Sequence, residues 1–237
     1  MPYDKLERLQ DLYTKWAGCE RCGLCASRRN MVFADGAPGG PILLLGERPN
    51  YEEDKFGKPL LGPPGKLIGE IISNVRQGNP DAIIDEMIHI TNLVMCRPPK
   101  DRSPTPDELD ACWPRLRDQI RIVDPWLIIT LGGTALNLLV ANSKKKMPKQ
   151  KKVRGVPAAP KLPPMSVLKS RGEVVDIPIY FPGFGSRSFP VLPMLQPNYL
   201  LQRPDMNEGG ELKNTVDDFD AAFKIIDTLK EAYERGQ

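Results

Sequence analysis

Residues 41–46 are Pro41-Ile42-Leu43-Leu44-Leu45-Gly46, a short unbroken apolar run that ends in glycine. Such a run predicts a strand buried on both faces, as the inner strands of a parallel sheet are. Similar runs at 87–95, 126–131 and 189–195 predict three further strands. Together they predict a central, mainly parallel sheet of four strands.

Between these runs the apolar residues recur at helical spacing, over 66–76, 106–122, 133–140 and 215–235. Alternating strands and helices predict an α/β fold with helices on both faces of the sheet. Ligand sites in such sheets lie beyond the carboxyl ends of the strands. The loops that follow Leu45, Met95 and Leu195 are therefore the candidate functional loops.

The first 16 residues predict a charged amphipathic helix rather than a signal peptide, with Leu6, Leu9, Tyr13 and Trp16 on one face. The longest apolar run, at 126–131, is far shorter than the ~20 residues that a membrane span needs. We expect a soluble cytoplasmic protein without a membrane partner.

The chain has 237 residues, and its 33 basic and 30 acidic residues leave a net charge of only +3. We expect a single domain over 1–237, interrupted by a basic and proline-rich insertion at about 142–188. The insertion's charges are Lys144, Lys145, Lys146, Lys149, Lys151, Lys152 and Arg154. This stretch fits either a solvated loop or an arm that follows DNA phosphates.

Five cysteines suggest a metal centre in a reducing compartment rather than a set of disulfides. Cys19, Cys22 and Cys25 are spaced by three, and Cys96 and Cys112 could complete a ligand set. Four thiolates suit either a structural zinc ion or a [4Fe–4S] cluster, and one thiol remains spare. His89 lies in a predicted strand, which makes it a core residue rather than a ligand.

A nucleotide-binding loop is excluded. The stretch Gly62-Pro63-Pro64-Gly65-Lys66-Leu67 faintly resembles a phosphate-binding loop, but Leu60 stands where glycine is required and Leu67 where a hydroxyl must reach magnesium. We therefore expect no nucleotide cofactor.

Two loops carry polar groups suited to other chemistry. The acidic residues between Gly46 and Asp54 could position a water molecule, or could be a solvated loop without function. Asn92 ends the second predicted strand, where its amide could pair with the edge of a base. The arginines that follow it suit phosphates.

Six motifs occur in a fixed order along the chain. They are Cys19-x-x-Cys22-x-Leu24, Gly46-Glu47-x-Pro49 with Glu53-Asp54, Gly57-x-Pro59-x-x-Gly62-x-x-Gly65, Ile90-Thr91-Asn92-x-x-x-Cys96-Arg97-Pro98-Pro99, Cys112, and Pro197-x-Tyr199-Leu200-Leu201. Together they resemble the iron–sulfur, family-four branch of the uracil-DNA glycosylase superfamily. Only the region 142–188 is unmatched between about residue 19 and about residue 204.

The resemblance implies a three-layer α/β/α sandwich and a [4Fe–4S] cluster on Cys19, Cys22, Cys96 and Cys112. It implies that Glu47 holds the attacking water, that Asn92 reads the base edge, and that Gln196 stands where the family has a histidine that donates to the base. The base pocket would contain Arg48, Pro49, Asn50, Glu53 and Leu60. The DNA-binding residues would be Arg97, Arg102, Asn198, Leu200, Leu201 and Arg203, with the two leucines as a wedge.

The pocket also departs from the family pattern. Leu60 replaces an aromatic on which uracil stacks, Asn50 replaces a glycine, and Arg48 replaces a small residue. These changes favour a DNA glycosylase whose partner is DNA with a modified pyrimidine larger than uracil. We expect the protein to be a monomer. Hydroxymethylated or glucosylated cytosine of phage DNA would fit, and the role would be antiviral defence. An ordinary uracil-repair enzyme and a catalytically silent iron–sulfur DNA-binding module remain as alternatives.

Overall fold

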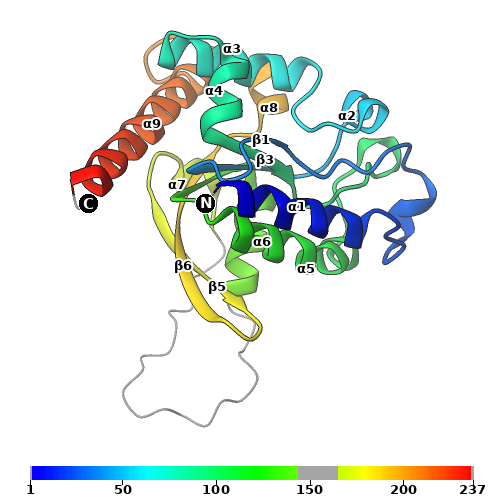
Figure 1. Ribbon diagram of the computed structural model, residues 1–237. Coiled ribbons are helices and arrows are strands. Elements are labelled where there is room, and N and C mark those ends of the chain that lie inside the picture. The colour runs from blue at the N-terminus through cyan, green and yellow to red at the C-terminus, as the bar shows by residue number, and fades with distance from the viewer. Residues whose placement is uncertain (1, 144–164, 236–237) are drawn as a thin grey trace.

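The computed structural model describes residues 2–143 and 165–235, and six strands form one sheet in the order β1-β3-β2-β4-β6-β5 (Figure 1). The strands are β1 (Asp35–Gly36), β2 (Ile42–Gly46), β3 (Ile88–Asn92), β4 (Leu127–Leu131), β5 (Val175–Phe181) and β6 (Gly185–Met194). The inner strands β3, β2, β4 and β6 run parallel, as expected.

The expected number of four strands is wrong, because an antiparallel strand is added at each edge. One of them, β5, lies within the stretch assigned to the insertion. Its Ile177 and Ile179 are fully buried, and Pro178 lies between them. Because β5 forms the edge of the sheet, Pro178 is tolerated there. The basic residues 144–154 lie outside the described residues.

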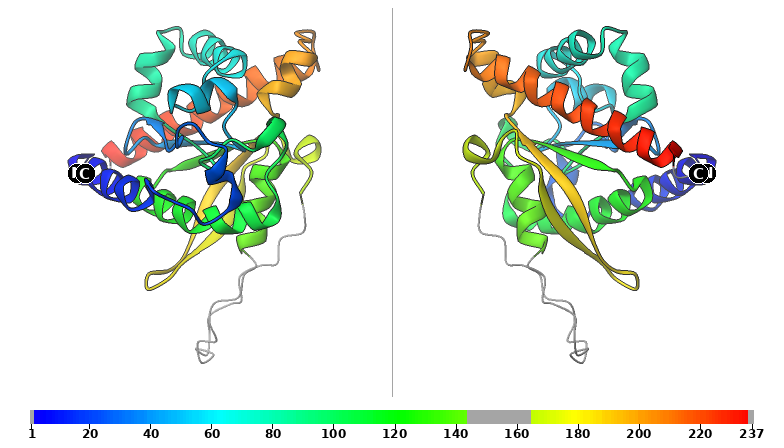
Figure 2. Two further views of the ribbon diagram at one scale, coloured as in Figure 1. Left: turned by 90° about the vertical axis from the view of Figure 1, so that its right-hand side faces the viewer. Right: turned by 90° about the vertical axis from the view of Figure 1, so that its left-hand side faces the viewer.

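Two layers of helices enclose the sheet, which confirms the three-layer arrangement (Figure 2). One layer contains α3 (Pro63–Arg76), α4 (Pro80–Met87) and α9 (Glu211–Arg235), and the other contains α5 (Pro106–Val123) and α6 (Gly133–Ser143). In β2, Ile42 and Leu44 pack toward α3 and α9, while Leu43 and Leu45 pack toward α5 and α6. Both faces of the central strand are therefore buried.

The amphipathic helix expected at the N-terminus is α1 (Pro2–Trp16), which packs beside α5. Its buried residues are Leu9, Leu12 and Trp16, whereas Leu6 and Tyr13 are exposed. The buried face of α1 is therefore rotated about the helix axis relative to the face expected from the sequence. These side chains join a third core cluster with Cys96 and Cys112, so α1 closes the region that contains the cysteines.

Short helices occupy the connections: η1 (Gly23–Ala26), α2 (Tyr51–Phe56), η2 (Pro99–Asp101), α7 (Val167–Ser170) and α8 (Pro197–Gln202). Among the helices in the described part of the chain, none is long and apolar enough to cross a membrane.

His89 is buried, as expected, with Nδ1 3.0 Å from the carbonyl oxygen of Ala37 and Nε2 2.9 Å from Nε2 of Gln119. Burial lowers the pKa of His89 to about 4.

Candidate active site and cysteine centre

A small pocket lies at the carboxyl edge of the sheet, and all three expected catalytic residues line it. Glu47 directly follows β2, Asn92 is the last residue of β3, and Gln196 precedes α8 just after β6. The ends of parallel strands meet at one edge of the sheet, and this brings together residues that are far apart in sequence.

Glycines at two strand ends make room for the side chains of the pocket. Gly46 pairs with Asn92 across β2 and β3, and a Cβ atom at Gly46 would collide with Oδ1 of Asn92. Gly132 has φ +94°, and a Cβ atom there would lie 3.3 Å from Cβ of Gln196. The amides of Asn92 and Gln196 therefore lie close against the backbone at these strand ends.

Two polar atoms of the pocket are buried and have no hydrogen-bond partner among the described residues: Oε1 of Glu47 and Nδ2 of Asn92. A carboxylate oxygen accepts hydrogen bonds, and an amide nitrogen donates them. Buried polar groups are normally satisfied, so an unpaired acceptor and an unpaired donor in one pocket suggest that a bound molecule completes them.

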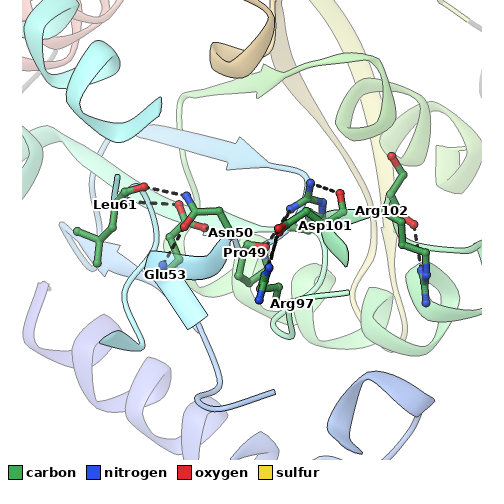
Figure 3. Close-up of polar contacts among 9 residues, drawn as sticks. Pro49, Asn50, Glu53, Leu61, Arg97, Asp101 and Arg102 are labelled. Carbon is green, nitrogen blue, oxygen red and sulfur yellow. Dashed lines mark hydrogen bonds and ion pairs between the residues drawn. The ribbon is translucent and has the colours of Figure 1, made fainter. Parts of the chain in front are cut away.

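The side chains of Asn50 and Glu53 are occupied by local structure. Oδ1 of Asn50 accepts from the backbone N–H of Glu53 at 2.9 Å, and Oε2 of Glu53 accepts from the backbone N–H of Asn50 at 3.0 Å. This capping box starts α2, and Nδ2 of Asn50 also donates to the carbonyl oxygen of Leu61 at 2.8 Å (Figure 3). Burial raises the pKa of Glu53. Both residues line the pocket, but their polar groups already hold the loop together.

Arg48 also lines the pocket, but its guanidinium is held by Asp101. Its Nη1 lies 3.0 Å from Oδ1 of Asp101 and 3.2 Å from the carbonyl oxygen of the buried Pro49 (Figure 3). Arg97 binds the same carboxylate through Nε at 2.9 Å and Nη2 at 2.6 Å, and this contact lowers the pKa of Asp101. One carboxylate therefore holds two arginines beside the pocket.

Leu60 lines the pocket at the position where the resemblance implies an aromatic ring. Its backbone is left-handed, with φ 61°, and its carbonyl oxygen occupies the space that a Cβ atom of Gly65 would need. The backbone at this wall of the pocket is thus fixed by close contact with the first turns of α3.

The structure separates the two leucines of the expected wedge. Leu200 is fully buried in the core and cannot enter a base stack, so this part of the prediction is corrected. Leu201 is 40% exposed, and Asn198 lines the pocket. Arg203 is exposed, with its guanidinium 4.9 Å from the ring centre of Tyr199. Arg102 binds Glu108 through both terminal nitrogens, at 2.8 and 2.7 Å.

All five cysteines are free, and all five line a second, smaller hollow. It is formed by the segment after α1, the loop after β3 and the start of α5. No three His, Cys, Asp or Glu side chains in the described residues are placed to hold one metal ion. A cluster that distributes four thiolates over several irons does not require this arrangement. Burial raises the pKa of the Cys96 thiol.

Two guanidiniums lie beside the sulfurs of this hollow. Nη1 of Arg28 is 3.4 Å from Sγ of Cys96 and donates to the carbonyl oxygen of Cys19 at 2.7 Å. Nη2 of Arg115 is 3.7 Å from Sγ of Cys112. Positive donors next to thiol sulfurs fit a group whose ligands are thiolates.

Arg115 was not among the residues expected to have a function. Arg115 is fully buried, and it shares the inward face of α5 with Cys112 and Gln119. Its position three residues after a cysteine, on the apolar side of a predicted helix, was the available signal.

One family model and two proteins of known name are similar to this chain over most of its length. A family model described as the uracil DNA glycosylase superfamily matches residues 33–222. A type-4 uracil-DNA glycosylase of Thermotoga maritima is 32% identical over 227 residues, which cover 94% of this chain and 97% of that protein. A type-4 uracil-DNA glycosylase of Saccharolobus solfataricus is 38% identical over 152 residues, which cover 64% of this chain and 67% of that protein.

Proposed function

The chain belongs to the uracil DNA glycosylase superfamily and is a DNA glycosylase, and we propose that it flips a pyrimidine nucleotide out of DNA and hydrolyses its N-glycosidic bond. The observation that carries this proposal is the pair of buried, unpartnered atoms in the pocket, Oε1 of Glu47 and Nδ2 of Asn92. We also propose that the protein acts as a monomer in the reducing cytoplasm, a compartment that its five free cysteines suit.

Glu47 and Asn92 would act on opposite sides of the bond that breaks. As the bond from the sugar carbon to the base nitrogen breaks, its electron pair leaves with the base and the sugar becomes cationic. The Glu47 carboxylate stabilises that cation and orients a water molecule, whose oxygen bonds to the sugar carbon and whose proton Glu47 accepts. Asn92 donates from Nδ2 to a base oxygen, where negative charge develops.

Gln196 would be a second donor to the departing base. Its amide can donate a hydrogen bond but stays neutral, so it stabilises the developing charge less than a charged donor would. Its place beside Gly132 at the pocket wall is consistent with this role.

We further propose that Cys19, Cys22, Cys96 and Cys112 hold a [4Fe–4S] cluster and that Cys25 is spare. The chemistry of the hollow supports this assignment, since its five thiols are all free and Arg28 and Arg115 lie against two of the sulfurs. When bound, the cluster would tie the segment after α1 to the loop after β3 and would take no part in the hydrolysis.

Uracil is the first candidate for the excised base. The similar proteins of Thermotoga maritima and Saccharolobus solfataricus are both named for uracil. The structure also weakens one argument for a larger base, because Arg48 and Asn50 are already bound to Asp101 and Leu61. They are therefore poor candidates for new contacts with a substrate.

A modified pyrimidine, such as hydroxymethylated or glucosylated cytosine, is the second candidate. Leu60 and Gln196 favour it, because both line the pocket and replace an aromatic ring and a histidine of the family pattern. An enzyme of this specificity would remove bases from phage DNA and serve antiviral defence.

Incubation with three DNA duplexes separates these candidates. The duplexes carry uracil, 5-hydroxymethylcytosine or glucosylated 5-hydroxymethylcytosine, and alkali-labile abasic sites are scored. Cleavage at uracil alone rules out the modified base, and cleavage only at the modified cytosines rules out uracil repair. Binding to all three duplexes without any cleavage would contradict the enzyme and favour a silent DNA-binding module.

The substitution Leu60→Phe provides a second test of which base the protein excises. It places a ring in the pocket, so it should favour a flat base such as uracil over one with a bulky substituent. The measurement is the ratio of the two excision rates, because a loss of stability would lower both rates together. An unchanged ratio would remove position 60 from the determinants of specificity.

A further inference from the structure

Arg115 holds the end of the strand that carries Asn92. Its Nη2 donates to the carbonyl oxygens of Asn92 at 2.7 Å and Leu93 at 2.9 Å. Its Nη1 donates to Oγ1 of Thr91 at 3.0 Å and to Oε1 of Gln119 at 2.7 Å. The guanidinium therefore binds three consecutive residues where β3 ends and the pocket begins.

The same guanidinium reaches the cysteine hollow. Nη2 of Arg115 lies 3.7 Å from Sγ of Cys112, one turn earlier on α5. A single side chain thus contacts both the backbone of a pocket residue and an expected cluster ligand. Arg28 differs in this respect, because it contacts Cys96 and Cys19 and makes no described contact with the pocket.

The charge of Arg115 is not balanced by a carboxylate. The guanidinium is fully buried, and within the described residues its partners are neutral oxygens and the sulfur of Cys112. A buried charge is costly unless an opposite charge or a complete set of hydrogen bonds compensates it, and Nε of Arg115 has no described partner. A thiolate at Cys112 would supply the missing negative charge.

We propose that Arg115 is a positioning residue that couples the cysteine centre to the base-binding amide of Asn92. This inference rests on the proposed function and extends it. Cys112, as a cluster ligand, balances the guanidinium, and the guanidinium in turn fixes the end of β3 so that Nδ2 of Asn92 lines the pocket. Cluster and pocket are then linked through one side chain, although neither takes part in the chemistry of the other.

The test compares Arg115→Gln with the matched variant Arg28→Gln in the iron-loaded protein. Each substitution removes a positive donor from a ligand sulfur, so each should move the midpoint potential of the cluster to a more negative value. Only Arg115→Gln should also lower the maximal single-turnover rate of base excision, by roughly ten- to a hundredfold. The DNA affinity measured in the same titration should change little. Arg28→Gln loses no described contact with β3, so its rate should stay well above that of Arg115→Gln.

The outcomes are distinguishable. A normal excision rate in Arg115→Gln, or an unchanged potential in that variant, would overturn the coupling, and so would a wild-type protein without iron. If Arg115→Gln does not fold, Arg115→Lys keeps the charge but reaches fewer acceptors, so its potential should stay near the wild-type value while its rate falls. A normal rate in Arg115→Lys would then overturn the proposal. The potentials are measured without DNA, so a wild-type protein that excises no base contradicts the proposed function separately.

Discussion

The pocket and the cysteine hollow use their polar atoms in opposite ways. In the pocket, Oε1 of Glu47 and Nδ2 of Asn92 are buried without a described partner. In the hollow, guanidiniums already lie beside the sulfurs of Cys96 and Cys112. Unpaired groups suit a ligand that arrives and leaves, whereas a prepared positive environment suits a group that stays. This contrast supports the proposal that the pocket binds a substrate and that the hollow holds a cofactor.

The largest effect is expected at the pocket. Glu47→Gln keeps the size of the side chain but removes the charge that would stabilise a cationic sugar, so excision should fall by roughly 10²–10⁴-fold. Single-turnover assays on DNA with the susceptible base measure the rate, and fluorescence anisotropy should show unchanged DNA binding. The control is Glu52→Gln, in the first turn of α2, which should leave the rate unaltered. Equal losses in the two variants would mean that Glu47 is not a specific catalytic carboxylate.

The hollow should respond to substitution in an all-or-none manner. Cys22→Ser or Cys96→Ser removes a ligand, so the purified protein should lose its brown colour and its iron. Cys25→Ser should keep both. Iron and zinc analysis of the three variants makes the comparison, and a colourless wild-type protein with stoichiometric zinc would replace the cluster by a zinc site.

A moderate effect on the excision rate is expected at Gly46, whose backbone lies against the side chain of Asn92. Gly46→Ala would force Oδ1 of Asn92 to move, and a small displacement of that amide should lower the excision rate by roughly ten- to a hundredfold. In Gly69→Ala the new Cβ would be 3.8 Å from Cβ of Pro80, which is ordinary contact. This control should keep the wild-type rate. A normal rate in Gly46→Ala would show that Asn92 tolerates displacement.

An effect on stability rather than on the excision rate is expected in the network between the two regions, where His89 contacts Gln119 and Gln119 contacts Arg115. The pKa of His89 is lowered to about 4 by burial, against about 6.5 in an unfolded chain. The unfolded chain therefore binds more protons between these pH values, and the free energy of unfolding should fall by up to about 3 kcal/mol as the pH drops from 6.5 to 4.

Denaturant titrations at several pH values measure this slope. The variant His89→Gln should lack the component between pH 6.5 and 4, whatever its absolute stability. Asp101, whose pKa is lowered by Arg97, loses its stabilising charge only below the unfolded value near 4. An identical slope in wild type and variant would mean that His89 does not titrate in this window.

The arrangement of the pocket could be predicted because it follows from general rules. Parallel strands end at one edge of a sheet, which indicated the loops that follow the strands, and the family resemblance then implied Glu47, Asn92 and Gln196. All three line one pocket. The helices α1, α3, α5, α6 and α9 could be predicted from apolar spacing, with errors of a few residues at their ends, whereas α4 was not expected. The edge strand β5 could not, because Pro178 argues against a strand until its place at the edge is known.

The contacts and the exposure of individual side chains could not be predicted from the sequence. Asn50 could serve as a helix cap or as a substrate donor, and only the capping box decides for the cap. Arg48 is held by Asp101, which is 53 residues away along the chain. Leu200 and Leu201 are neighbours of the same type, and the way in which α8 packs decides that only Leu201 is exposed. Each of these outcomes depends on tertiary contacts.

The positions of the two regions along the chain also set the order in which a ribosome completes them. The last cysteine of the hollow is residue 112, whereas the pocket needs residues up to Asn198. At synthesis rates of ~5–20 residues per second, the interval between them is on the order of ten seconds. A nascent chain therefore contains all five thiols, on four of which the proposed cluster would form, well before the residues of the pocket are complete.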